Sequence, residues 1–321
     1  MGDVRFYDFD FNLLYILPAS AEKTGYISMN AQKEFNGNGS LELVFCDEEL
    51  KKIIDTHKDV LLISWDNFQG FITGHRWDTR YRVTGKHLNG LLKRAVIKKT
   101  TTELNGDVET LAREAIENNV AWLTFGEECG TVKKVKYSTD KYLKANEYIQ
   151  NLLRLDKAGY EIKADFINKK YIFSCIKSKE NPIILSEENL NAYEFETTYT
   201  NSDLAFSGWY EKEQPEDSEG NKPDPVWTYI TLDETKKGIH NIVDILSATN
   251  ETDAINELKN KKSLYEIAVQ TRGLKCGVDY RVGDIIRVQN DGIITKKLVS
   301  GVSMWSEQGY GEEPILTEME D

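Results

Sequence analysis

The sequence predicts a β-rich α+β protein whose strand-rich ends flank a helical middle, an arrangement that allows two small β-barrel domains with an inserted α+β domain. The 22 glycines, 16 tyrosines and 6 tryptophans favour strands and turns over a helical bundle. Alternating apolar patterns dominate both ends, whereas helical periodicity is concentrated between residues 101 and 190. A chain of 321 residues is also long for a single core, so we expect more than one domain.

Residues 1–100 are predicted to form the first β-barrel domain. Polar and glycine-rich breaks separate its strand-like runs, and Asn36–Gly39 is the clearest turn. The expected strands are Val4–Phe11, Leu13–Leu17, Gly39–Phe45, Val60–Trp65, Phe68–Thr73 and Tyr81–Thr84.

Residues 101–190 are predicted to form the α+β domain, with two helices followed by a hairpin. The first helix is expected behind a cap at Asp107 or Asn105. The second helix is expected to begin after Ser138 or Thr139 and to end at Gly159. The apolar faces that predict the two helices consist of Val108, Leu111, Ala112, Ala115 and Ile116, and of Tyr142, Ala145, Ile149, Leu152 and Leu153. The hairpin is expected from strands Tyr160–Phe166 and Tyr171–Ile176.

Residues 191–321 are predicted to form the second β-barrel domain, with a helical insertion near Thr252–Asn260 and an acidic tail. Half of the prolines lie within Glu211–Pro225, which predicts a surface loop or a flexible hairpin tip. Glu307–Asp321 carries six acids and no base, which predicts a solvated tail or an arm ordered by a partner. The expected strands are Tyr193–Tyr199, Ala205–Glu211, Val226–Thr231, Leu264–Thr271, Asp284–Gln289 and Ile293–Met304.

The net charge of −13 argues against a nucleic-acid binder that relies on phosphate contacts. An acidic wall would suit a conduit that must not hold passing DNA, and a charge that only keeps the protein in solution is the alternative. No apolar run approaches the roughly 20 residues that a membrane-spanning helix needs, so we expect no membrane span.

The residues that usually carry catalysis or metal binding are scattered. The cysteines Cys46, Cys129, Cys175 and Cys276 form no Cys-x-x-Cys pair, and His57, His75, His87 and His240 have no i, i+4 zinc spacing. The adjacent acids Glu127–Glu128 and Glu187–Glu188 do not suit glycosidase geometry, because neighbours in a strand point to opposite faces. We therefore expect no catalytic residues, no cofactor and no metal.

One motif is Tyr280-Arg281-Val282-Gly283-Asp284, which precedes the apolar run Ile285–Val288. Gly283 can adopt a backbone conformation that other residues avoid, and Asp284 can hydrogen-bond the turn. The motif predicts a tight corner that opens a buried strand.

A second set of motifs lies upstream. Trp65, Phe68 and Gly70 belong to an aromatic strand that continues as "FQGFITG". The segment "VTGKHLNGLLKRAVI" follows, and it predicts a short helix with an apolar face and a cationic rim. Its notable residues are Gly85, Leu91, Leu92, Lys93 and Arg94. An ordinary amphipathic helix fits this pattern.

The order of "FQGFITG", "VTGKHLNGLLKRAVI" and a distant "YRVGDIIRV" resembles the Gp37-like tail proteins of long-tailed phages and, more broadly, the baseplate hub superfamily. The resemblance implies a structural protein of the virion tail, assembled in the host cytoplasm, with two pseudo-symmetric β-barrels per chain. It implies a homotrimer that joins the six-fold tail tube to a trimeric spike or fibre and forms part of the DNA channel. The implied partners include tail tube or distal tail protein rings and the tape measure protein. The resemblance also places a comparable "GLLKR" element in the first barrel, which implies a subunit contact with acidic neighbours.

Two other functions remain open. A tail-associated peptidoglycan hydrolase would match larger relatives of the resembled family, which carry lytic domains. A glycan-binding adhesion module would use exposed aromatic side chains such as Trp209, Trp227 and Trp305 as its platform.

Overall fold

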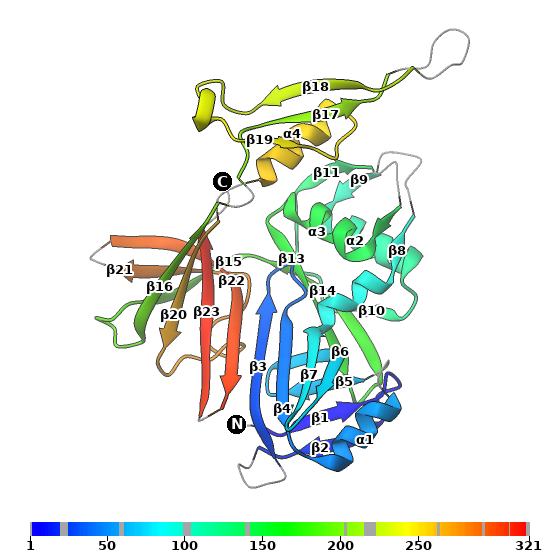
Figure 1. The fold of residues 1–321 in the computed structure, drawn as a ribbon, viewed down its shortest axis with the longest axis vertical. Coiled ribbons are helices and arrows are strands. Elements are labelled where there is room, and N and C mark those ends of the chain that lie inside the picture. Colours follow the sequence, from blue (N-terminus) through cyan, green and yellow to red (C-terminus); the bar gives the residue numbers. More distant parts are fainter. Residues whose placement is uncertain are drawn as a thin grey trace. The chain divides into compact units, whose positions relative to one another are not determined.

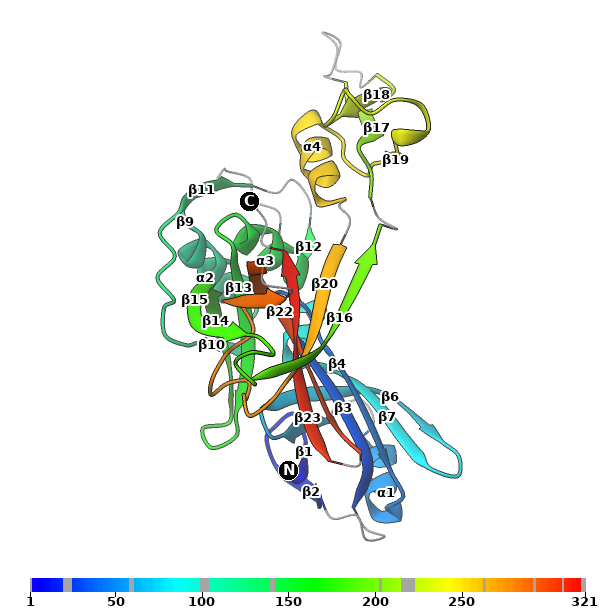
Figure 2. The same ribbon diagram turned by 90° about the vertical axis from the view of Figure 1, so that its left-hand side faces the viewer.

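The structure is a computed structural model of the chain. It describes residues 2–19, 25–57, 61–98, 104–138, 142–201, 204–214, 223–261, 264–290, 293–307 and 309–318. The chain divides into two compact units: unit 1 comprises residues 1–196 and 268–321, and unit 2 comprises residues 197–267. Figures 1 and 2 show the elements from two directions. The three-domain division with boundaries at residues 100 and 190 stays a prediction.

A 13-stranded sheet forms the main part of the fold (Figure 1). Eleven of its strands follow one hydrogen-bonded path: β16 (Ala192–Thr200), β20 (Leu264–Thr271), β23 (Tyr310–Glu318), β22 (Ile293–Ser306), β3 (Tyr26–Glu34), β4 (Ser40–Phe45), β7 (Tyr81–His87), β6 (Phe68–Trp77), β5 (Leu62–Trp65), β1 (Val4–Tyr7) and β2 (Leu13–Leu17). β15 (Lys179–Leu185) pairs with β21 (Asp284–Asn290), which in turn pairs with β22.

The long strand β22 joins the two ends of the chain. Residues Ile293–Leu298 pair with β21, residues Gly301–Ser306 pair with β3, and β23 pairs along the other edge. The strands of both chain ends therefore share one sheet, and no sheet in the described ranges closes into a barrel. Two separate barrels are thus not confirmed, because the local alternation that predicts a strand does not specify its partner across most of the chain.

The middle of unit 1 is an α+β region with its own small sheets. Its elements are η1 (Leu88–Arg94, a 3-10 helix), β8 (Val96–Ile97), β9 (Leu104–Asp107), α2 (Val108–Asn119), β10 (Leu123–Phe125), β11 (Lys134–Tyr137), β12 (Leu143–Lys144), α3 (Ala145–Arg154), β13 (Ala158–Asp165) and β14 (Lys170–Lys177). The three-stranded sheet has the order β10-β14-β13. Buried side chains of η1, α2, α3 and this sheet, among them Leu92, Ile116, Leu152 and Phe173, form one core.

Several local predictions are confirmed in this region. Asp107 caps α2, since its side chain accepts a hydrogen bond from the backbone N–H of Thr110 at 2.9 Å. β13 and β14 form the predicted antiparallel hairpin. The predicted start of the second helix is wrong at Ser138, because α3 begins after Lys144, which forms no side-chain cap; Thr139 lies outside the described residues.

Three elements of the first hundred residues were not predicted, namely β3, α1 (Glu48–His57) and the two-residue strand β8. β3 is the partner of β22, and α1 buries only Leu50 and Ile54. The apolar stripe of α1 is narrow and its remaining positions are mostly charged, which left little periodic signal.

The expectation of a solvated acidic tail is wrong for residues 310–318, which form β23 between β20 and β22. Burial alternates along this strand, and Glu312 is only 8% exposed. Its carboxylate accepts hydrogen bonds from the Tyr310 and Tyr280 hydroxyls and from the Cys276 N–H. These partners stabilise an acid whose sequence context alone suggested solvent. Residues 319–321 lie outside the described residues.

In its described residues, unit 2 contains a three-stranded sheet in the order β18-β17-β19 and one α-helix. Its elements are β17 (Ser207–Lys212), β18 (Val226–Thr231), η2 (Gly238–His240, a 3-10 helix), β19 (Val243–Ile245) and α4 (Glu251–Asn260). The predicted helix near Thr252–Asn260 is confirmed as α4, which Asn250 caps by accepting from Asp253 N–H at 2.9 Å. Of the loop predicted at Glu211–Pro225, residues 215–222 lie outside the described residues.

Phe35 connects three parts of unit 1. Its N–H donates to the Ser300 carbonyl at 2.7 Å, directly beyond β3. A Cβ atom at Gly159 would lie 2.3 Å from a carbon of the Phe35 ring, and one at Gly283 would lie 2.7 Å from the same carbon. Gly159 therefore makes room for Phe35 within β13 and does not end a helix, which corrects the predicted role; α3 ends at Arg154.

Gly283 has a φ of 95°, so the predicted glycine corner is present and also contacts Phe35.

We expect Gly283→Ala to lower the free energy of unfolding by about 3 kcal/mol, because it adds a clash with the Phe35 ring to the backbone strain. Gly273→Ala is a matched control: its φ is 75° and nothing lies within 4 Å of the added Cβ, so the expected loss is about 1 kcal/mol. Urea denaturation measures both, and equal losses would disprove the importance of the Phe35 contact.

Candidate functional site

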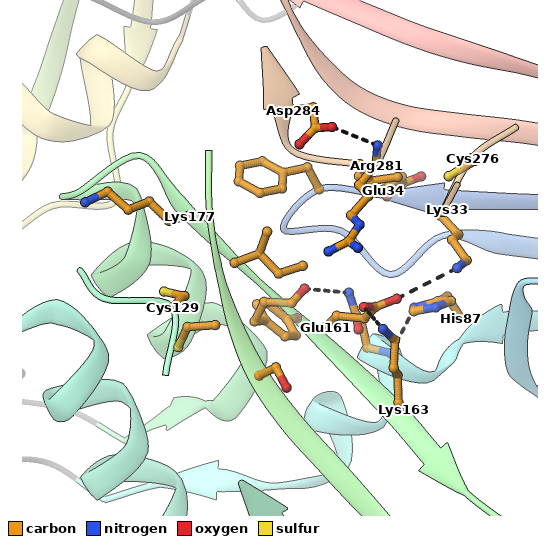
Figure 3. A pocket seen from close by; sticks show the side chains of 18 of the residues that line it. Lys33, Glu34, His87, Cys129, Glu161, Lys163, Lys177, Cys276, Arg281 and Asp284 are labelled. Carbon is orange, nitrogen blue, oxygen red and sulfur yellow. Dashed lines mark hydrogen bonds and ion pairs between the residues drawn. The ribbon is translucent and has the colours of Figure 1, made fainter. Parts of the chain in front are cut away.

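A cleft with a volume of about 940 Å³ lies within unit 1, where segments from the beginning, middle and end of the chain meet (Figure 3). The first segment contributes residues between Lys33 and Asn89, and the last contributes residues between Cys276 and Asp284. The middle segment contributes Glu127–Cys129 and residues between Tyr160 and Lys179. Residues that are far apart in the sequence therefore pack together around this cleft.

An ion cluster connects β3 to β13 in this cleft (Figure 3). The Glu161 carboxylate lies 2.8 Å from the Lys163 ammonium and 3.8 Å from the Lys33 ammonium. Burial raises the pKa of Glu161, but Lys33 and Lys163 outweigh this effect and hold the pKa below its ordinary value. Arg281 reaches into the same cleft from the loop before β21 (Figure 3).

His87 lies beside this ion cluster and is 4% exposed. Its Nδ1 accepts a hydrogen bond from the Asn89 N–H at 3.3 Å, which caps η1. Burial, with a further contribution from the charge of Lys33, lowers the pKa of His87 to about 3, and Glu161 opposes the shift. His87 is therefore a neutral, structural side chain at ordinary pH.

Two side-chain amides form hydrogen bonds with the backbone N–H and C=O groups along the edge of β13 that faces away from β14. The Asn89 amide accepts from Ile162 N–H at 2.8 Å and donates to the Tyr160 carbonyl at 3.2 Å. Gln69 repeats the pattern at the next position, since it accepts from Ala164 N–H at 2.8 Å and donates to the Ala164 carbonyl at 3.1 Å. An amide offers a donor and an acceptor together, so these side chains replace a neighbouring strand.

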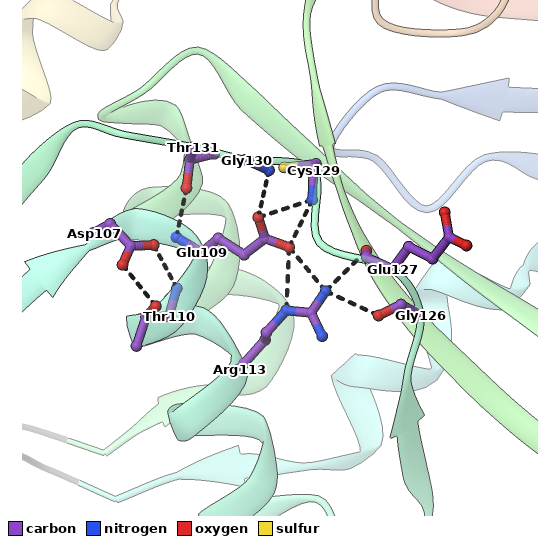
Figure 4. A network of polar contacts seen from close by, with 9 residues as sticks. All are labelled: Asp107, Glu109, Thr110, Arg113, Gly126, Glu127, Cys129, Gly130 and Thr131. Carbon is purple, nitrogen blue, oxygen red and sulfur yellow. Dashed lines mark hydrogen bonds and ion pairs between the residues drawn. The ribbon is translucent and has the colours of Figure 1, made fainter.

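The wall formed by residues 126–131 is held by Glu109 of α2 (Figure 4). Its carboxylate accepts from the backbone N–H groups of Cys129 and Gly130, at distances of 2.9 to 3.0 Å. Arg113 donates to the same carboxylate and to the carbonyls of Gly126 and Glu127. Burial raises the pKa of Glu109, but these hydrogen bonds outweigh it and lower the pKa. The carboxylate thus fixes a loop, and its acceptor sites are occupied by the chain itself.

The predicted corner before β21 is built from hydrogen bonds within the chain. Asp284 is 5% exposed, and its carboxylate accepts from Arg281 N–H at 3.0 Å and from the Asn181 amide at 2.9 Å. Tyr280 is 2% exposed and donates to Glu312 at 3.5 Å. These contacts order the last segment beside the cleft.

The upstream motif residues occupy β5, β6 and β7. Trp65 and Phe68 are fully buried and pair with each other across the β5–β6 turn. Gly70 pairs with His87, and Gly85 pairs with Ile72 in the neighbouring strands. This motif thus forms the sheet beside the cleft, while any role in subunit contacts stays a prediction.

The predicted short helix "GLLKR" lies in η1. Leu91 and Leu92 are buried in the core of unit 1, whereas Lys93 and Arg94 are exposed. The Arg94 guanidinium lies 5.0 Å from the Phe71 ring centre and 5.1 Å from that of Phe9. The apolar face with a cationic rim is therefore present, and its use in subunit contacts stays a prediction.

The sequence prediction missed Gln69, Asn89, Glu109 and Glu161 as organisers of the cleft. Gln69 and Asn89 lie inside the quoted motifs, where each is a polar amide among apolar and glycine positions. A buried amide must find hydrogen-bond partners, and this was the available signal. Nothing comparable distinguishes Glu109 or Glu161 from the chain's other acids.

The chemistry of the cleft does not resemble a hydrolytic centre. Burial raises the pKa of the thiols of Cys129 and Cys276 to about 11, so both are protonated and poor nucleophiles. Glu127 and Glu128 lie exposed on the loop. In the described ranges, no group of three His, Cys, Asp or Glu residues is placed to hold a metal ion. No described helix is long and apolar enough to span a membrane.

No family model and no curated protein matches the chain. Solved structures do match over nearly its whole length. A tail protein from Neisseria meningitidis MC58 is 10% identical with a TM-score of 0.56, and covers 99% of this chain and 97% of its own. The 43 kDa tail protein of prophage MuSo2 from Shewanella oneidensis is also 10% identical, with a TM-score of 0.55 and 98% of each chain covered.

The prophage tail protein gp18 from Listeria monocytogenes EGD-e is 15% identical, with a TM-score of 0.51 and coverage of 99% of this chain and 95% of its own. At these identities the likeness shows the fold: the chain has a β-rich fold shared with phage tail proteins. The narrower resemblance to the Gp37-like family is not confirmed, since no family model matches.

We expect Asn89→Ala to lower the free energy of unfolding by about 3 kcal/mol, because the buried N–H of Ile162 loses its acceptor. Gln69→Ala, at a half-buried site, is the matched control and should cost about 1 kcal/mol, since water can replace Gln69 at the N–H and C=O of Ala164. Chemical denaturation of both variants tests this. A loss below 1 kcal/mol for Asn89→Ala would contradict the edge-pairing role.

Stability should fall as the pH is lowered from 6.5 toward 3, because the unfolded chain protonates His87 while the folded chain keeps it neutral. At pH 5 this amounts to about 2 kcal/mol. The His87→Gln variant lacks this term, so its loss of stability between pH 7 and pH 5 should be smaller than that of the wild type by about this amount. Identical losses in urea titrations of the two proteins would refute the prediction.

Proposed function

We propose that this chain is a structural, non-enzymatic baseplate hub or tail-tip protein of a phage or phage-like particle. The observation that carries the proposal is the whole-length likeness to tail proteins, which spans 97–99% of the Neisseria protein and of this chain. A likeness of this extent leaves little of either chain unmatched. The cleft supports a structural role, because its charged groups are engaged in fixing segments of the same chain.

In this role the protein is a homotrimer in the virion tail. Each chain contributes two similar β-rich halves, so three chains present six similar elements to a six-fold tail tube and three to a spike or fibre. This arrangement resolves a symmetry mismatch without a second protein species. The strands of both chain ends are joined through β22 in one sheet, and the division into two similar halves is part of the proposal.

The proposed partners are tail tube or distal tail protein rings, the tape measure protein, and the spike or fibre. Assembly takes place in the host cytoplasm, and the ring forms part of the DNA channel. Three copies carry a formal charge of −39, three times the −13 of one chain, which favours a wall that does not hold phosphate. The Arg94 guanidinium already packs on Phe9 and Phe71 of its own chain, and the proposal is that Lys93 and Arg94 face protein and not the channel.

A glycan-binding adhesion module is the second candidate, because Trp209 and Trp227 are 43% and 49% exposed. Trp305 does not join them, since it lies half-buried in β22. No observation favours the peptidoglycan hydrolase. A glycan array tests the adhesion module and zymography on peptidoglycan tests the hydrolase; we expect no signal in either.

Immunogold electron microscopy of purified particles tests the location. We expect gold at the tail end farthest from the capsid, and we expect cells with the gene deleted to produce no complete tails. Complementation with the intact gene provides the control. Label along the whole tail shaft, or normal tails from the deletion strain, would contradict the proposed role.

A further inference from the structure

The sheet of unit 2 has one covered face and one open face. α4 packs on the covered face (Figure 2). Ala254 and Leu258 of α4 join Tyr210 and Leu246 there in a small core. Because side chains alternate along a strand, the odd-numbered residues of β17, β18 and β19 point to the opposite face. α4 therefore leaves that face uncovered.

The open face is apolar and aromatic. Strand register places Trp209 beside Tyr229 on one side and Ile245 on the other. Trp227 and Val243 extend the same face along β18 and β19. The exposed fractions are 43% for Trp209, 49% for Trp227, 42% for Tyr229, 46% for Val243 and 72% for Ile245. We name these five residues the open face of unit 2.

The open face is ordered without a partner. The Trp209 and Tyr229 rings are in contact, with centroids 5.2 Å apart. The Tyr229 hydroxyl accepts a hydrogen bond from the Asn241 amide at 2.9 Å. The buried Ser207 hydroxyl is hydrogen-bonded to the Thr231 hydroxyl and to the Asn241 amide oxygen. A platform held in this way loses little conformational entropy when another surface covers it.

Acidic side chains border one end of the open face. Glu211 pairs with Trp227 across the strands and shares its face, while Glu213 and Asp224 are exposed beside the same strand ends. Residues 197–267 contain 14 acidic and 7 basic residues, a net charge of −7 out of −13 for the chain. A surface that covers the open face must therefore tolerate, and gains from facing, negative charge.

We propose that the open face of unit 2 is a docking site for a different protein, one that presents apolar side chains bordered by Lys or Arg. The inference rests on the open face alone and does not require the proposed function. Clustered Trp and Tyr with exposed aliphatic neighbours are typical of the energetic centre of protein interfaces. A sugar would use the aromatic rings but gain little from Ile245 and Val243. A second copy would bring another acidic chain against the acidic border.

Photo-crosslinking in the particle-producing cell tests the proposal first. The photoreactive p-benzoylphenylalanine replaces Ile245 in the full chain, and in a matched control it replaces Lys259, which is exposed on α4. We expect position 245 to yield one dominant product with another protein, through a peptide rich in Lys or Arg, and position 259 to yield little. No product, a product with a second copy, or one within the same chain would overturn the proposal.

Calorimetry with the purified crosslinked partner then measures the contribution of the open face. We expect Trp209→Ser and Ile245→Ser to raise the dissociation constant at least tenfold, and Glu211→Lys to do the same at low salt. Ile239→Ser is the control, because Ile239 is 94% exposed but lies in η2 outside the sheet, and it should leave the affinity unchanged. Unaltered melting temperatures establish that the variants fold. Equal dissociation constants for the wild type and all variants would refute the docking site. Glycan-array binding by the wild type that Trp209→Ser abolishes would also refute a protein partner.

Discussion

The edge of β13 is the constraint on which the organisation of unit 1 depends. A strand edge that is buried against another part of the chain must have its N–H and C=O groups paired, and Asn89 and Gln69 supply that pairing from outside the small sheet. Because each amide matches one N–H and one C=O, the register of β13 against β6 and η1 is fixed. The Lys33–Glu161 ion pair and the contact of Phe35 with Gly159 then follow from the same placement.

The local features of this fold were predictable from sequence, and the long-range ones were not. The Asp107 cap, the β13–β14 hairpin and the Gly283 corner depend on residues close in the chain, so their signals survive in a short window. The pairing of β3 with β22 depends on residues at opposite ends of the chain. The acidic residues of β23 predicted an exposed segment, because the sequence does not show that the Tyr280 hydroxyl and the Cys276 N–H donate hydrogen bonds to Glu312.

The candidate site shows the same division. The quoted motifs led to the correct strands and to η1, but the amides that organise the cleft gave no signal beyond their polarity in an apolar context. The side chains in the cleft of a type that can be catalytic have structural roles. Glu109 accepts hydrogen bonds from a backbone loop and His87 caps η1. Burial keeps the Cys276 thiol protonated. Groups engaged in this way hold segments of unit 1 in place and are not free to react.

The most direct test of the account is a reconstruction of the tail end of the particle by electron cryomicroscopy without imposed symmetry. The account predicts three copies of this chain around a central channel, between a six-fold ring and a three-fold tip. One copy, or six equivalent copies, at this position would contradict it.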